Sequence, residues 1–134
     1  FFQKINFLTN LNSSGGYSYF NTNLFSGFET NPFIEDQRIT DIDFGFKQHY
    51  SIYGNFTIPA GYVFDALPQN ISMAMPGRIA QFTRNMDSKD NLLNMKIDID
   101  FKQPFYVSAN YDDFHKKKKK MMAALNEQVV IKKK

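Results

Sequence analysis

The chain has 134 residues, which suits one domain with its own buried core. It contains no cysteine and no run of 18 apolar residues, so disulfides, thiolate metal sites, thiol nucleophiles and helical membrane spans are excluded. The formal net charge of +3 comes from two lysine runs at residues 116–120 and 132–134, because the rest of the chain carries −5. We interpret these runs as solvated surface and expect no nucleic-acid partner.

The first thirty residues give a weak secondary-structure signal. Apolar side chains in residues 2–8 predict the start of a strand, and residues 10–16, rich in Asn, Ser and Gly, predict a loop. A second strand is expected from Tyr17 onward, with Leu24, Phe25 and Phe28 as its candidate continuation. Asn31-Pro32 then marks a turn. The sequence leaves open whether residues 1–30 belong to the same domain as residues 31–134.

From residue 50 onward the sequence has the pattern of an antiparallel sheet. Apolar and polar residues alternate with a period of two, so each strand buries one face and exposes the other. We expect strands at residues 50–58, 62–66, 71–75, 79–86 and 93–101, and a short piece at Tyr106 and Val107. Loops are expected at residues 59–61, 76–77 and 87–91. In the clearest strand, Ile97 and Ile99 should be buried while Asp98 and Asp100 face water.

The C-terminal part combines one helix with a last strand. Asn110 is a candidate N-cap, and Asp112 and Asp113 suit the positive end of a helix that runs to about Asn126. The β-branched residues at positions 129–131 predict a final short strand. Fifteen Phe and seven Tyr favour a phenylalanine-packed β core. We therefore predict a mainly β fold, an antiparallel β-sandwich with one C-terminal helix and a final short strand.

Several short motifs carry a family resemblance over residues 31–134. They are Asn31-Pro32-Phe33, residues 38–46 from Arg38 to Phe46, the turn Ile58-Pro59-Ala60-Gly61-Tyr62 that leads to Leu67-Pro68, and the ending at residues 127–134. In this order and spacing the chain resembles the C-terminal domain that follows the transglutaminase-like core in exported proteins of Gram-negative anaerobes. The resemblance implies that this chain is a β-rich accessory domain and that the catalytic Cys, His and Asp residues belong to the transglutaminase-like core. It also implies a periplasmic or cell-surface location.

One stretch departs from that family pattern. Phe114, Met121 and Leu125 form an apolar stripe on the predicted helix, and Lys118 falls on the stripe with Lys117 beside it. The resemblance implies aromatic residues at these positions. A lysine can bury its aliphatic stem and lift its ammonium group to water. Two lysines on a core-facing helix remain unusual.

No combination of side chains forms a complete catalytic or metal-binding pattern. Asp112, Asp113 and His115 diverge around a helix, so the charge pattern of a helix N-terminus explains them better than a metal site does. His49 stands alone near the start of a strand. Because the chain has no cysteine, a transglutaminase triad cannot be built within it. We assign no catalytic, cofactor-binding or metal-binding residue and expect no cofactor.

Paired carboxylates have an ordinary explanation as well. Asp98 and Asp100 share one strand face, and Asp41 and Asp43 share another. Two nearby carboxylates are what a glycosidase needs for catalysis. Alternating Asp residues are also normal on the solvent-facing side of an antiparallel sheet. Asp43-Phe44-Gly45 lacks the other kinase motifs, so we interpret it as a chance match. We expect Arg38 to form a structural ion pair with Asp41 or Asp43.

Two functions of different classes follow from these observations. The leading hypothesis is a non-catalytic accessory domain that docks against, or extends from, a transglutaminase-like core in the same exported protein. The alternative is a glycan- or peptide-binding β-sandwich module, which would use the wet sheet face or an exposed edge strand. For a glycan, the candidate stacking residues are Tyr17, Tyr19, Tyr53 and Tyr62.

Overall fold

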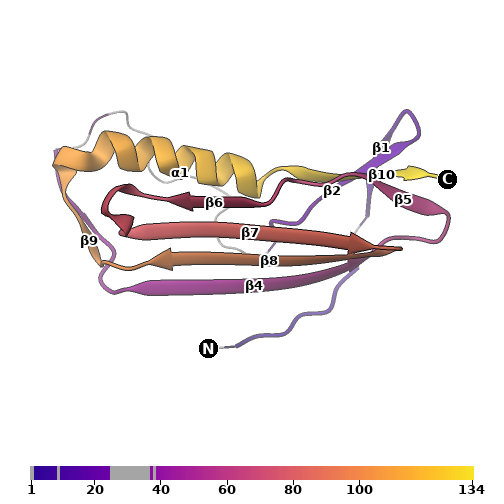
Figure 1. Ribbon diagram of the computed structural model, residues 1–134, viewed down its shortest axis with the longest axis horizontal. Helices are drawn as coiled ribbons and strands as arrows, with labels where there is room; N and C mark the ends of the chain where they lie inside the picture. Colours follow the sequence, from indigo (N-terminus) through magenta and orange to yellow (C-terminus); the bar gives the residue numbers. More distant parts are fainter. Residues whose placement is uncertain (1, 9, 25–36, 38) are drawn as a thin grey trace.

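The computed structural model describes residues 2–8, 10–24, 37 and 39–134. The predictions that concern Phe25, Phe28, the Asn31-Pro32-Phe33 turn and the Arg38 ion pair lie outside these residues. Within the described residues the fold is mainly β, with antiparallel sheets, a C-terminal helix and a final short strand (Figure 1). The predicted fold class is therefore confirmed.

The largest antiparallel sheet has the order β4-β8-β7-β6. Its strands are β4 (Gln48–Thr57), β6 (Ile71–Ala74), β7 (Ala80–Lys89) and β8 (Leu92–Phe101). The ten residues of β8 pair without a break with β4 on one side and with β7 on the other. As predicted, Ile97 and Ile99 are buried, and Asp98 and Asp100 alternate with them on the opposite, partly solvated face. We call that opposite side the outer face of this sheet.

A second four-stranded sheet, also antiparallel, has the order β1-β2-β10-β5. It consists of β1 (Asn12–Ser14), β2 (Tyr17–Asn21), β5 (Tyr62–Ala66) and β10 (Gln128–Lys133). The predicted final strand is β10, which lies in the interior of the sheet between β2 and β5. A two-stranded ladder of β3 (Ile42–Asp43) and β9 (Phe105–Tyr106) lies at the other end of the molecule (Figure 1).

In Figure 1 the helix α1 (Tyr111–Leu125) runs alongside β6 and leads into the strand β10 that follows it. Its buried residues pack in one core with the inner-face residues of the large sheet. Two short 3-10 turns, η1 (Pro76–Arg78) and η2 (Ser108–Asn110), join the elements, and η2 leads directly into α1. The second sheet lies at the end of the molecule where α1 leads into β10 (Figure 1). One continuous core of side chains from both sheets and the helix results. Phe44 links its parts, because its ring contacts those of Phe101 and Phe114.

Several local predictions were wrong for identifiable reasons. Residues 2–8 form no strand. The segment 10–16, expected to be a loop, contains the strand β1, and the turn that follows this strand is made by Gly15 and Gly16, both with positive φ. The hairpin loop expected at residues 87–91 contains only Asp90 and Asn91, since β7 continues to Lys89. Asp90 reaches this tight turn by adopting a φ of 54°. Asn110 precedes α1 but makes no side-chain capping bond.

Candidate functional site

The register of the large sheet brings together polar residues that are far apart in the sequence. On its outer face, His49 of β4 lies opposite Asp100 of β8, and Ser51 lies opposite Asp98. One pair further along, Tyr53 lies opposite Lys96. His49 and the pair Asp98 and Asp100, which sequence analysis considered separately, therefore meet in one cluster. Ser51 was not among the candidate residues.

Asp98 is the centre of this cluster. It accepts a hydrogen bond of 2.5 Å from the Ser51 hydroxyl, and its other oxygen lies 3.2 Å from the Lys96 ammonium. The bond from Ser51 and the nearby Lys96 charge hold the pKa of Asp98 below its usual range. The same ion pair raises the pKa of Lys96. His49 Nε2 lies 3.0 Å from Ser51 Oγ, and His49 Nδ1 lies 3.8 Å from Asp100.

Serine, histidine and aspartate in this order are the residue types of a hydrolytic triad. Here, however, Ser51 directs its only hydroxyl proton to Asp98, so His49 Nε2 must donate to Ser51 Oγ and cannot act as its base. The His49 side chain is 59% exposed, and the cluster lies on an open sheet face. The geometry therefore fits a polar surface network that links β4 to β8, with no catalytic role evident.

The other candidate carboxylates have structural partners. Asp41 accepts a hydrogen bond from the Ser108 backbone N–H at 2.6 Å, and Asp43 accepts one from the Gly45 N–H at 2.7 Å. Asp112 pairs with Lys116 one helical turn away at 2.7 Å, while His115 stacks on Tyr111. Among the described residues, no group of three His, Cys, Asp or Glu side chains is placed to hold a metal ion.

The four candidate stacking tyrosines do not form one platform. Tyr17 and Tyr19 lie on β2 and Tyr62 on β5 of the smaller sheet, whereas Tyr53 lies on β4 of the large sheet. Tyr53 is highly exposed on the outer face, with the Lys96 ammonium 5.5 Å from its ring centre. The structure thus separates the residues on which the glycan hypothesis depends.

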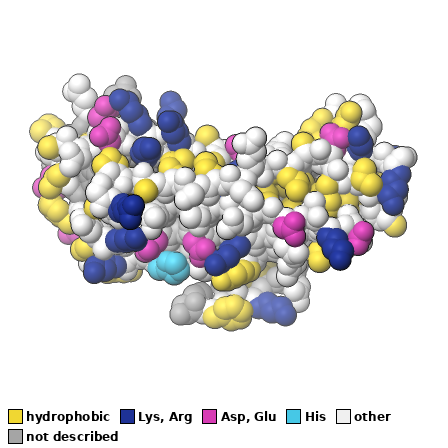
Figure 2. Space-filling view, viewed as in Figure 1, with side chains coloured by type: hydrophobic (Ala, Val, Ile, Leu, Met, Phe, Trp, Pro, Cys, Tyr) yellow, Lys and Arg dark blue, Asp and Glu magenta, His cyan; other side chains and the backbone are white. Residues whose placement is uncertain are grey.

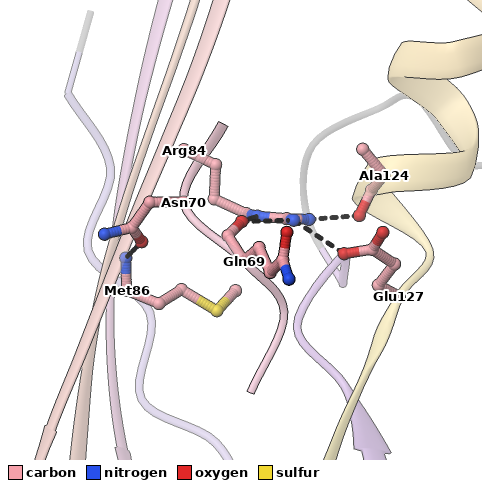
Figure 3. A network of polar contacts seen from close by, with 6 residues as sticks. All are labelled: Gln69, Asn70, Arg84, Met86, Ala124 and Glu127. Atoms are coloured by element: carbon pink, nitrogen blue, oxygen red, sulfur yellow. Dashed lines mark hydrogen bonds and ion pairs between the residues drawn. The ribbon is translucent and has the colours of Figure 1, made fainter. Parts of the chain in front are cut away.

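The most deeply buried charged group is one that sequence analysis missed. Arg84 lies on the inner face of β7, 2% exposed, where the alternation Ala80, Phe82, Arg84, Met86 places an arginine at a core position. Its guanidinium donates to the backbone carbonyl of Gln69, to that of Ala124 and to the Glu127 carboxylate (Figure 3). The Nη2 atom lies 2.7 Å from both Gln69 O and Glu127 Oε2.

This arginine joins three segments of the chain. Ala124 belongs to the last turn of α1, whose carbonyls have no partner inside the helix, and a cation at that position also suits the negative end of the helix dipole. Gln69 lies between β5 and β6, and Glu127 lies between α1 and β10. A side-chain oxygen of the neighbouring Asn70 accepts from the Met86 N–H at 2.7 Å (Figure 3). The arrangement is a structural connection in which all three guanidinium nitrogens donate to nearby groups of the chain.

The lysine on the helix stripe, Lys118, is buried, so the interpretation of residues 116–120 as solvated surface is wrong at this position. Lys118 is 3% exposed, and its ammonium nitrogen lies 5.5 Å from the centre of the Phe101 ring. Contact with the ring favours the charged form, but burial opposes it more strongly and lowers the pKa of Lys118 to about 8. Lys117 beside it is only partly buried, so the two lysines differ in environment.

We expect Lys118→Met to stabilise the fold at neutral pH. The unfolded chain binds a proton at Lys118 up to about pH 10.5, whereas the folded chain releases it near pH 8. The contribution of Lys118 to stability therefore rises between about pH 8 and pH 10.5 and is least favourable below pH 8. The free energy of unfolding of the variant should be about 1–3 kcal/mol higher than that of the parent at pH 7. Its stability should also no longer rise between pH 8 and pH 10.5.

Urea melts of the parent and the variant from pH 7 to pH 10.5 measure this difference. Lys119→Met, at an exposed position of the same helix, is the matched control and should leave the pH profile unchanged. Parallel profiles for the parent and Lys118→Met would show that Lys118 does not lose its proton in the folded state within this range.

Comparison with known proteins gives one family and one similar structure. The family described as a domain of unknown function with a solved structure, DUF3858, matches residues 16–131. No relative among the curated proteins matches the sequence. The crystal structure of a "putative protease" from Parabacteroides distasonis aligns with 90% of this chain, with a TM-score of 0.68 and 12% sequence identity. The chain spans 24% of the length of that protein, and at this identity the likeness establishes the fold alone.

Proposed function

Because this chain belongs to the DUF3858 family of domains of unknown function, we propose that it is a non-catalytic accessory domain of a larger exported protein. It docks against, or extends from, a transglutaminase-like core in the same protein, at the cell surface or in the periplasm. The motifs of residues 31–134 support this assignment. The polar clusters also support it, because their side chains hold strands, turns and the helix together rather than converging on an open pocket.

Coverage in the similar structure supports a role within a longer chain. The fold occupies about a quarter of that protein, so the same architecture occurs there beside other polypeptide. A domain of this kind needs a surface toward its neighbour. Interfaces between domains are often marked by contiguous exposed apolar side chains.

The observation that carries the proposal is an apolar end of the molecule around the β3–β9 ladder. Ile39 is 98% exposed and Phe46 is 66% exposed, and both lie within four residues of β3. Phe105 of β9 and the adjacent Val107 are also exposed. Figure 2 shows hydrophobic side chains at the end where this ladder lies. We call these four residues the apolar end patch and propose that the transglutaminase-like core docks against it.

A binding experiment with the core tests this assignment. The parent protein is first identified from the genomic sequence upstream of Phe1, which should encode a core with Cys, His and Asp. Calorimetric titration of the separate core with this chain should show binding. The double variant Ile39→Ser, Phe46→Ser should weaken it at least about tenfold, since burial of each large apolar side chain contributes about 1.5–3 kcal/mol.

Tyr53→Ser is the matched control, because Tyr53 is 69% exposed but lies on the outer face of the large sheet. It should bind the core like the parent chain. The chain alone should release no ammonia from a glutamine peptide, since it has no thiol. An upstream sequence without such a core, or equal loss of binding in Tyr53→Ser and the double variant, would refute the proposal.

A further inference from the structure

A groove lies between the N-terminal segment and the far end of β4. Its volume is about 350 Å³, within the range of small-ligand and peptide-side-chain sites. Ile5, Phe7, Phe20 and Phe56 contribute apolar side chains to its lining, and Asn6 and Asn55 supply polar groups. The Phe7 ring meets the Phe56 ring edge-on, with 6.3 Å between the ring centres, and the centres of the Phe20 and Phe56 rings lie 5.7 Å apart. The groove is therefore built around an aromatic wall.

The backbone beside this groove is the edge of a sheet. Among the described residues β4 pairs with β8 alone, and all ten of its residues are in register with that partner. Strand edges are normally protected by charged residues, proline, bulges or shortness. The strand β4 has none of these, since residues 48–57 include no Lys, Arg, Asp, Glu or Pro and the ladder has no bulge.

From the groove and this edge together, we propose that residues 53–59 form a binding site for an extended, uncharged peptide segment with one large apolar side chain. The peptide backbone pairs with the edge of β4, and the apolar side chain enters the groove, whose lining includes Phe7 and Phe56. This is recognition by strand addition, in which the main chain supplies affinity and a side-chain pocket supplies specificity.

Charge and shape argue for this occupant. No residue that lines the groove is charged, so a charged side chain would lose its hydration there without gaining an ion pair. Gly54, on the inner face of β4, leaves room for Phe56, because a Cβ atom at this position would lie 2.6 Å from the Phe56 ring. The ring is thereby held beside the strand edge. Only an extended backbone can satisfy a row of strand-edge amides and carbonyls.

The test uses a synthetic peptide, acetyl-Thr-Val-Thr-Phe-Thr-Val-Thr-amide, added to the isotope-labelled full chain and followed by NMR. We expect saturable shifts of the backbone amides of residues 53–57 and of the Asn55 side-chain amide. Replacing the central Phe by Ala should weaken binding by about tenfold, the loss of one buried aromatic anchor. Replacing it by Pro, which removes a donor and fixes φ, should abolish the shifts.

Variants of the protein locate the site. Phe7→Ser removes a groove wall, and Asn55→Lys places a charge on the exposed side of the edge, so both should weaken binding by about tenfold. The second variant changes an exposed residue, which keeps the test valid if Phe7→Ser proves unstable. Phe46→Ser changes an exposed phenylalanine of the apolar end patch and should bind the peptide normally.

This proposal does not depend on the presence of a transglutaminase-like core, and the variants separate the two. Phe7→Ser should leave docking of the core intact, while the end-patch variants should leave peptide binding intact. The absence of shifts at millimolar peptide would overturn the proposal, as would equal binding of the proline peptide. Shifts of β4 that depend on protein concentration without peptide would assign the edge to a second copy of this chain instead.

Discussion

Deleting residues 128–134 should unfold the domain or leave it aggregation-prone. The deletion removes β10, the strand that joins β2 to β5. It also removes Val129 and Ile131, both completely buried in the core. Loss of these side chains and of two ladders should lower the free energy of unfolding by about 5 kcal/mol or more, which is comparable with the total stability of a small domain. Circular dichroism melts and light scattering measure the effect.

A matched control retains the backbone and removes only the charges. Changing Lys132, Lys133 and Lys134 together to Gln keeps both ladders of β10 but breaks the Lys132–Asp65 ion pair, whose atoms lie 2.8 Å apart. Because such exposed pairs contribute little, this variant should melt within about 1 kcal/mol of the parent chain. A deletion variant that melts like the parent would show that β10 is dispensable, contrary to its central place in the sheet.

Arg84→Ala should be the most damaging single substitution outside the purely apolar core. It removes the Arg84 donors from the partly buried Gln69 carbonyl and leaves the Ala124 carbonyl with only the 3.3 Å bond from the Glu127 N–H. It also opens a space on the inner face of β7. The lost hydrogen bonds to these carbonyls and the cavity left by the arginine side chain together predict a loss of about 3–5 kcal/mol in the free energy of unfolding. Urea denaturation monitored by circular dichroism gives this value directly.

Two further variants show which contacts of Arg84 matter. Glu127→Gln should cost less than about 1 kcal/mol, because the Glu127 side chain is 50% exposed and its amide can still accept from the guanidinium. Arg84→Lys should destabilise the fold more than Glu127→Gln and less than Arg84→Ala, since a single ammonium group cannot reproduce the forked hydrogen bonds of the guanidinium. If Glu127→Gln were as damaging as Arg84→Ala, the ion pair rather than the two carbonyls would hold the segments together.

Sequence periodicity predicted the parts of the fold in which burial dictates residue type. In β8 the isoleucines at positions 97 and 99 alternate with aspartates, and only one register of such a strand buries the apolar residues. The segments for which prediction failed lack this contrast. The strand β1 has the sequence Asn-Ser-Ser with all three residues exposed, so its composition is that of a loop. It is a strand because β2 lies beside it and provides the ladder.

The polar clusters could not be predicted because they depend on strand pairing. Sequence analysis treated His49 and Asp100 separately, since they are 51 residues apart and meet only through the β4–β8 register. Arg84 carried one local signal, an arginine on the apolar side of an alternating strand. Its partners Gln69, Ala124 and Glu127 come from three other segments, and no local pattern connects them.

The central position of β10 also sets an order of assembly. The strands β2 and β5 are made more than sixty residues before β10 and do not pair with each other. While the ribosome is still synthesising α1, the smaller sheet therefore lacks its middle strand, and the edges of β2 and β5 are open. The hairpins of the large sheet, which join neighbours in sequence, can form earlier. We infer that the nascent chain passes through a stage with open strand edges, which is when chaperones would protect it most effectively.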